Sequence, residues 1–174
     1  MKQFIADAML GKLARWMRMM GCDVEYFSEI SDCALSDRAQ RGNRIILTRD
    51  TRLIQRKINR DNAFLVIGDH YPDQLRQVVR AFNIDPFKDL LSRCLRCNMP
   101  LVSCNKNDLA GKIPPYVFET QDRFETCSQC RKIYWKATHV EKMVEQLRNI
   151  FGANRLPEKP AVEPLERFYD PETI

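Results

Sequence analysis

Residues 44–52 read RIILTRDTR, an apolar run that ends in an arginine, an acid and a second arginine. Its first part, residues 45–48, has the composition of a buried strand. Asp50 follows the point where that strand ends, and it lies between Arg49 and Arg52. The pattern predicts a carboxylate that is placed by a rigid strand.

Three other apolar runs share this character: FIADA at 4–8, DVEYF at 23–27 and AFLVIG at 63–68. Helical stretches separate them: a stripe of Leu10, Leu13, Met17 and Met20 that Gly21 can end, then segments at 32–40, 51–59 and around 75–82. Strands that alternate with helices at this spacing indicate right-handed βαβ units and a mostly parallel sheet. We predict an α/β fold: a small three-layer domain over residues 1–90, with helices on both faces of the sheet.

Acidic residues lie where these predicted strands end. Asp7, Asp50 and Asp69 end or follow the first, third and fourth strands, and Asp32 and Asp37 belong to the helix after the second. The carboxyl ends of parallel strands share one edge, where ligands bind, so several of these acids should converge. Close carboxylates repel unless a cation neutralises them, and their oxygens suit Mg²⁺ or Mn²⁺. We predict Asp7, Asp32, Asp50 and Asp37 as catalytic acids, with Asp7 and Asp50 as Mg²⁺ or Mn²⁺ ligands.

Simpler explanations exist for some of these acids. Asp32 can be a helix N-cap, Asp37 an exposed helix residue and Asp69 a turn residue. The basic residues predicted to hold a nucleic-acid backbone are Lys12, Arg15, Arg49 and Arg52, although solvated charges of this kind are common. The net charge of +5 weakly favours a polyanionic partner.

The chain has seven cysteines, and an odd number without an export signal argues against a disulfide framework. Four of them form two C-x-x-C pairs, Cys94 with Cys97 and Cys127 with Cys130. Two such turns complete a tetrahedral zinc site with four thiolates, and an iron–sulfur or redox pair is the alternative. Because no ligand position stays open, the predicted zinc is structural. The remaining three, Cys22, Cys33 and Cys104, are predicted to be small buried hydrophobes.

The second half of the chain is predicted to be a zinc ribbon with a C-terminal helix over residues 91–152. PLVSC at 100–104 and KIYWKA at 132–137 have the character of short hairpin strands, and the helix carries its apolar residues from 140 to 151. The aromatic residues Tyr116, Phe118, Phe124, Tyr134 and Trp135 can stack on bases or form a small core, and for most of them we favour the core. The proline-rich segment 153–174 is predicted to be a flexible tail that can bind a protein partner.

Composition bounds the location of the chain. Hydrophobic residues make up 44% and charged residues 29%, a balance typical of soluble globular proteins. The sequence has no apolar run of about 18 residues, and the N-terminus lacks the pattern of a signal peptide. We therefore expect a cytoplasmic protein without a membrane partner.

Four segments together resemble the Mut-seven C-terminal ribonuclease family, which joins a PIN-like nuclease domain to a zinc ribbon. In chain order they are FIADAMLGKLARWMRMMGCDV, SDCALSDRAQRGNRIILTRD, RCLRCNMPL and PPYVFETQDRFETCSQCRKIYWKATH, within roughly residues 2–148. The resemblance implies a metal-dependent RNA nuclease, with Asp7, Asp32 and Asp50 at the acidic positions. Related PIN-like domains often have a second acid two residues after the LTRD aspartate, where this sequence has Arg52. Either Asp37 or Asp69 is a candidate to replace it.

Two functions follow as hypotheses. The first is metal-dependent cleavage of RNA phosphodiester bonds, in single-stranded or structured RNA, with the ribbon assisting RNA binding. The alternative is a non-catalytic RNA- or ribosome-binding protein whose nuclease site is degenerate.

Overall fold

The structure, a computed structural model, describes residues 2–135 and 138–152, without the side chains at 138 and 139. The predicted flexible tail at 153–174 lies outside the described residues. Four parallel strands form the first sheet: β1 (Gln3–Ala6), β2 (Asp23–Tyr26), β3 (Ile45–Thr48) and β4 (Ala63–Leu65). Their order in the sheet is β2-β1-β3-β4. This confirms the predicted α/β class.

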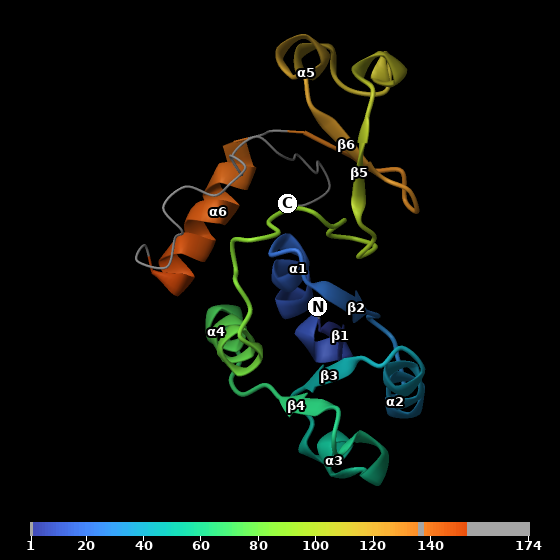
Figure 1. The fold of residues 1–174 in the computed structure, drawn as a ribbon, viewed down its shortest axis with the longest axis vertical. Coiled ribbons are helices and arrows are strands. Elements are labelled where there is room, and N and C mark those ends of the chain that lie inside the picture. Colours follow the sequence, from blue (N-terminus) through green and yellow to red (C-terminus); the bar gives the residue numbers. More distant parts are fainter. Residues whose placement is uncertain (1, 136–137, 153–174) are drawn as a thin grey trace.

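Helices connect these strands and cover both faces of the sheet (Figure 1). They are η1 (Ala8–Leu10), α1 (Gly11–Met19), α2 (Asp32–Arg41), α3 (Thr51–Gln55), η2 (Lys57–Asn59) and α4 (Tyr71–Phe82). Successive strand residues point to opposite faces. On one face Phe4 and Ala6 pack with α1 and α4. On the other face Ile5 packs with α2 and α3, which gives the three predicted layers.

Some predicted element boundaries are wrong. The first strand ends at Ala6 rather than at residue 8, because the chain turns into η1 directly after Asp7. The helix predicted over 51–59 is interrupted at Arg56, whose extended backbone separates α3 from η2. The fourth strand pairs over three residues only. Because the first and fourth strands end earlier than predicted, Asp7 and Asp69 lie beyond the ends of these strands.

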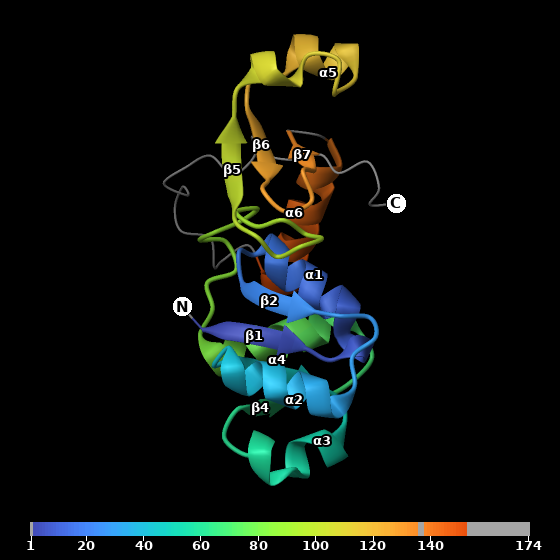
Figure 2. The same cartoon turned by 90° about the vertical axis from the view of Figure 1, so that its right-hand side faces the viewer.

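A three-stranded antiparallel sheet forms the upper part of the molecule (Figure 2). Its strands are β5 (Leu101–Cys104), β6 (Phe124–Cys127) and β7 (Ile133–Tyr134), accompanied by η3 (Lys106–Leu109) and α5 (Pro115–Thr120). PLVSC contains β5, and KIYWKA contains β7, although its residues 136 and 137 lie outside the described residues. β6 lies between these two strands and was missed because FETC is only four residues long and has apolar residues at its two ends alone, without the alternation that marks a strand. Phe124, Tyr134 and Trp135 are buried, as the core hypothesis predicts, whereas Tyr116 is 74% exposed.

The last helix, α6 (Thr138–Phe151), returns to the parallel sheet domain and packs against α4. Its buried residues Val144 and Leu147 belong to the same apolar cluster as Leu75 of α4. Arg76 Nε donates a hydrogen bond to the Ile150 carbonyl at 2.9 Å. The hydrophobic core therefore continues across the predicted boundary at residue 90, and the domain limits stay a prediction. Among the described residues, no helix has the length and apolarity that a bilayer crossing requires.

Gly21 forms the turn between α1 and β2 in a left-handed conformation, with φ of +81°. A Cβ there would lie 2.2 Å from the Asp89 carbonyl oxygen. Gly68 has a similar φ of +86°, and nothing lies within 4 Å of the position of its Cβ. The two glycines thus share backbone geometry and differ in crowding.

We predict that Gly21→Ala destabilises the protein more than Gly68→Ala does. Both substitutions incur backbone strain of about 1–2 kcal/mol, and Gly21→Ala adds a clash with backbone that costs a further ~1–3 kcal/mol. Urea unfolding followed by circular dichroism measures both free energies of unfolding. Equal losses would show that segment 85–93 does not pack against this turn.

Candidate acidic site and cysteine centre

Asp7 and Asp50 leave the sheet at neighbouring strand ends, where one buried hydroxyl links them. Thr48, which is fully buried, donates from Oγ1 to Asp7 Oδ2 at 2.7 Å. The same oxygen accepts the backbone N–H of Asp50 at 2.9 Å. Asp50 Oδ1 in turn accepts the Arg52 N–H at 2.7 Å and caps α3. The structure thus places the Asp7 carboxylate and the Asp50 backbone on one hydroxyl, and the role of both acids as Mg²⁺ or Mn²⁺ ligands stays a prediction.

The other acids of the predicted site have different surroundings. Asp32 forms an ion pair with Arg56 at 2.8 Å. Its explanation as an N-cap is wrong, because Ser31 caps α2 by accepting the Ala34 N–H. Asp37 lies five residues further on, a rotation of about 140° around the helix, so it faces away from Asp32. Its carboxylate is 59% exposed and pairs with Arg41 at 3.6 Å.

The predicted phosphate-binding residues flank the two central acids. Arg49 pairs with Asp69 at 2.5 Å, so Asp69 neutralises an arginine rather than joining the central acids. Lys12 Nζ lies 4.4 Å from the centre of the Tyr71 ring, and that ring stacks on Trp16. Arg52 is exposed and Arg15 is half-buried. Lys12 and Arg49 thus each have an identified neighbour, the Tyr71 ring and the Asp69 carboxylate.

Within residues 2–135 and 138–152, the only group of three or more cysteine, histidine or acidic side chains with ligand atoms within 4.8 Å of one another is the cysteine quartet. The acids therefore form no closed cage. Mg²⁺ is commonly held by one or two carboxylates together with waters and substrate phosphate, so the pair of Asp7 and Asp50 fits an ion that substrate completes.

The four cysteines Cys94, Cys97, Cys127 and Cys130 gather beside β7 and could bind zinc, as the sequence predicts. Cys94 Sγ lies 3.6 Å from Cys130 Sγ and 3.0 Å from the Tyr134 hydroxyl. Burial acts to raise the pKa of Cys94, but hydrogen bonds from Tyr134 and two backbone amides outweigh it and leave that pKa below its ordinary value. Burial and the neighbouring sulfurs raise the pKa of Cys97. Metal binding would therefore displace protons from part of this centre.

The first cysteine turn docks directly on the parallel sheet domain through Arg18. This side chain is 5% exposed and belongs to α1. Its Nε donates to the Val24 carbonyl at 2.8 Å, and its Nη1 donates to the carbonyls of Leu95 and Arg96 at 3.0 and 2.8 Å. One guanidinium thus connects α1, β2 and the cysteine turn.

Asn98 completes this junction at the edge of β2. Its Oδ1 accepts the Val24 N–H at 2.9 Å, and its Nδ2 donates to Asp23 at 2.7 Å. Asp23 also accepts a hydrogen bond from Arg44 at 2.7 Å. Burial would raise the pKa of Asp23, but the bonds from Arg44 and Asn98 outweigh it and lower that pKa below its ordinary value. The Asn98 side chain therefore makes a hydrogen bond to the β2 backbone that a neighbouring strand would otherwise make.

The sequence reasoning missed Thr48, Arg18 and Asn98. The LTRD motif contains Thr48 two residues before Asp50, so a hydroxyl at the end of a buried strand was a signal that could have been used. Of the three unpaired cysteines, Cys22 is buried and Cys104 is half-buried. The prediction for Cys33 is wrong: it is exposed, because it lies in the first turn of α2 on a side away from the sheet.

The fold and its two centres define a class of protein: a parallel α/β domain with paired acids at one sheet edge, joined to a four-cysteine ribbon. Residues 2–147 match the family model described as the Mut7-C RNAse domain, so the chain belongs to this ribonuclease domain family, as its sequence motifs suggest. Membership implies RNA as the substrate class. The comparison with curated proteins found no match. Neither did the comparison with solved structures.

We predict that Asn98→Gly destabilises the protein by roughly 1–3 kcal/mol, because buried groups of Val24 and Asp23 lose their partner. Glycine tolerates the positive φ of 68° at this position, so the substitution tests the side chain alone. Asn83→Gly is the matched control: Asn83 has a φ of 50° and an exposed side chain at the end of α4. Thermal unfolding should show a large decrease in stability for Asn98→Gly and a small one for Asn83→Gly. Equal losses would mean that the junction contributes nothing beyond backbone geometry.

Removal of metal from the cysteine centre gives another prediction. The purified chain should contain about one zinc ion, which Cys127→Ser or a strong chelator removes, while the exposed Cys33→Ser variant keeps it. Because Arg18 contacts the first cysteine turn, metal loss should also increase hydrogen exchange at the Val24 amide. Elemental analysis and exchange mass spectrometry measure these two effects. A brown protein with iron-dependent absorption would instead indicate an iron–sulfur centre.

Proposed function

We propose that this protein is a metal-dependent ribonuclease that cleaves RNA phosphodiester bonds at the sheet edge of Asp7 and Asp50. The observation that carries the proposal is the Thr48 hydroxyl, which binds the carboxylate of Asp7 and the backbone of Asp50 at once. Family membership supports the nuclease class. A reducing cytoplasm, where cysteines remain available to zinc, suits this assignment.

The donor set determines which metal fits. Oxygen ligands favour Mg²⁺ or Mn²⁺ over softer ions. Such an ion, when bound, lowers the pKa of a water molecule and offsets charge on the scissile phosphate. Asp7 and Asp50 would hold it, and Asp32, paired with Arg56 at the start of α2, is the third acid proposed for this end of the sheet. The catalytic role of Asp37 stays a prediction, since its carboxylate faces away from Asp32.

The basic residues would hold the RNA backbone beside these acids. Lys12 is exposed with its ammonium over the Tyr71 ring, and Arg52 is exposed at the start of α3. Arg49 and Arg15 are further candidates, although Asp69 already balances Arg49. Cationic groups at this edge position a polyanion without reading its sequence. Zinc at the cysteine centre would hold the ribbon on β2, and the ribbon would assist RNA binding.

The alternative function is a non-catalytic RNA- or ribosome-binding protein. Two observations favour it: Arg52 stands at the place of a second acid, and within the described residues no three acids gather as ligands. Under this alternative the cationic residues would keep their role, and the acids would have none.

We predict that the zinc-loaded chain cleaves single-stranded or structured RNA with Mn²⁺ or Mg²⁺ and stops when these ions are left out. Asp7→Asn and Asp50→Asn should each lower the cleavage rate by roughly 100-fold or more, because each removes an anionic ligand of the cation that offsets charge in the transition state. Asp61→Asn, in an exposed turn before β4, is the matched control and should keep the rate. Gel analysis of labelled RNA gives the rates.

Metal-independent cleavage, or equal rates in the Asp7 and Asp61 variants, would contradict this proposal. RNA binding without turnover under every divalent metal would instead establish the non-catalytic alternative.

A further inference from the structure

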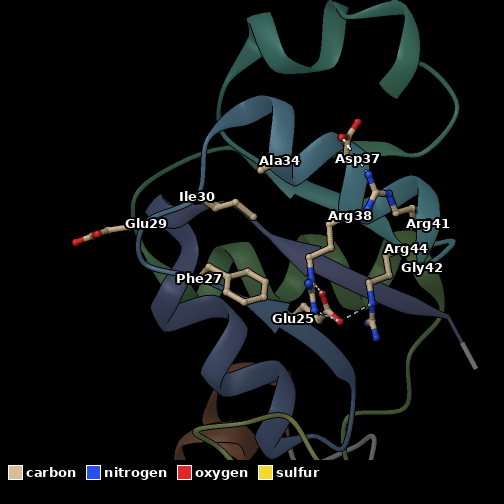
Figure 3. Close-up of a pocket in the computed structure, with 10 residues that line it drawn as sticks. All are labelled: Glu25, Phe27, Glu29, Ile30, Ala34, Asp37, Arg38, Arg41, Gly42 and Arg44. Atoms are coloured by element: carbon tan, nitrogen blue, oxygen red, sulfur yellow. Dashed lines mark hydrogen bonds and ion pairs between the residues drawn. The ribbon is translucent and has the colours of Figure 1, made fainter.

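A pocket of about 570 Å³ opens between α2 and the edge strand β2 (Figure 3). Ligand pockets commonly occupy roughly 300–1,000 Å³, so the volume suits a small organic group. Glu25 and Phe27 line it from β2 and the segment after it, and Ala34, Asp37, Arg38 and Arg41 line it from one face of α2. Neither Asp7 nor Asp50 lines this pocket, so it is separate from the acidic site.

The pocket nevertheless begins beside the acidic edge. In the parallel pairing of β1 with β2, Ala6 lies opposite Tyr26. The residues that follow, Asp7 and Phe27, therefore leave the sheet side by side on neighbouring strands, which lie about 4.8 Å apart. A chain bound across the acids can place its next residue in this pocket.

A stacked pair of side chains lies at this mouth, with the Arg38 guanidinium over the Phe27 ring. The Phe27 ring is 36% exposed, and the Arg38 guanidinium carbon lies 4.8 Å from its centre. Arg38 Nε donates a hydrogen bond to the Glu25 carboxylate, which also pairs with Arg44 at 3.3 Å. Aromatic rings and guanidinium planes are the surfaces on which unpaired bases stack.

The charge of the lining distinguishes between possible ligands. Three arginines (Arg38, Arg41 and Arg44) and three acids (Glu25, Glu29 and Asp37) line the pocket, so their formal charges cancel. A phosphate group would gain little there. The pair of Arg41 and Asp37 is exposed and 3.6 Å apart, so it costs little to open. It offers donors and an acceptor, which suits the edge of a neutral heterocycle.

We propose that this pocket binds one nucleobase of a single-stranded RNA, adjacent to the phosphate held at Asp7 and Asp50, with the base stacked on the outer face of the Phe27–Arg38 pair. This inference rests on the proposed function, since it requires RNA at the acidic edge. It adds a position that binds a base to a site whose basic residues are proposed to contact only the RNA backbone.

Binding of a labelled short single-stranded RNA, measured by fluorescence anisotropy without added Mg²⁺ or Mn²⁺, tests the inference without cleavage. Phe27→Ala should weaken binding by roughly 5- to 100-fold, the range expected for loss of one stacked base. Phe27→Tyr should restore it. Ile58→Ala is the matched control, because Ile58 is 42% exposed on η2 and lies outside the pocket. The affinity of this variant for RNA should equal that of the wild-type chain.

A second measurement identifies the bound group as a base. RNAs with one abasic nucleotide at successive positions should show one position that matters for the wild-type chain. In Phe27→Ala the same abasic substitution should cost nothing further, because both changes remove one interaction. A wild-type affinity for Phe27→Ala, an equal loss in Ile58→Ala, or abasic penalties that are the same in both chains would overturn the inference.

The outcomes separate this inference from the proposed function. If Asp7→Asn abolishes cleavage while Phe27→Ala binds RNA as the wild-type chain does, the pocket assignment alone is wrong. If the wild-type chain binds no RNA, both the pocket assignment and the ribonuclease proposal fail.

Discussion

The burial of one guanidinium group determines how the two halves of this protein meet. Arg18 is 5% exposed, and burial lowers its pKa. Removing a cation from water is costly unless its donors find acceptors. Its acceptors are the carbonyls of Val24, Leu95 and Arg96. The last two belong to the first cysteine turn, so one buried side chain joins α1, β2 and the four-cysteine centre.

The same junction protects the edge of the parallel sheet. Edge strands present unpaired N–H and C=O groups that can join another chain. On β2, the Asn98 side chain accepts a hydrogen bond from the Val24 N–H, and the Arg18 side chain donates one to the Val24 carbonyl. The strand's later residue Glu25 and the following Phe27 instead face the pocket beside α2. The ribbon therefore covers the start of this edge and leaves its end, nearest the acids, available to a ligand.

The sequence predicted the features that depend on local pattern. Alternating strands and helices predicted the α/β class, and cysteine spacing predicted that four cysteines gather where they could bind zinc. Asp7 and Asp50 could be placed together because parallel strands share an edge. Arg18 and Asn98 could not be found, since an arginine in an amphipathic helix and an asparagine in a turn read as solvated residues. Their partners lie far along the chain, as the 74 residues between Asn98 and Val24 illustrate.

In each of the two central carboxylates, one oxygen accepts a hydrogen bond from a neighbouring residue. Asp7 Oδ2 accepts from Thr48, and Asp50 Oδ1 accepts from the Arg52 N–H. An ionised carboxylate has acceptor sites on both oxygens, so capping α3 and binding a cation are compatible roles for Asp50. The hydrogen bond to one oxygen fixes the orientation of the carboxylate, and therefore the direction of its second oxygen. An acid between two arginines can therefore cap α3 and still suit the ligand role proposed for it: the backbone amide orients it, and Asp69 already balances Arg49.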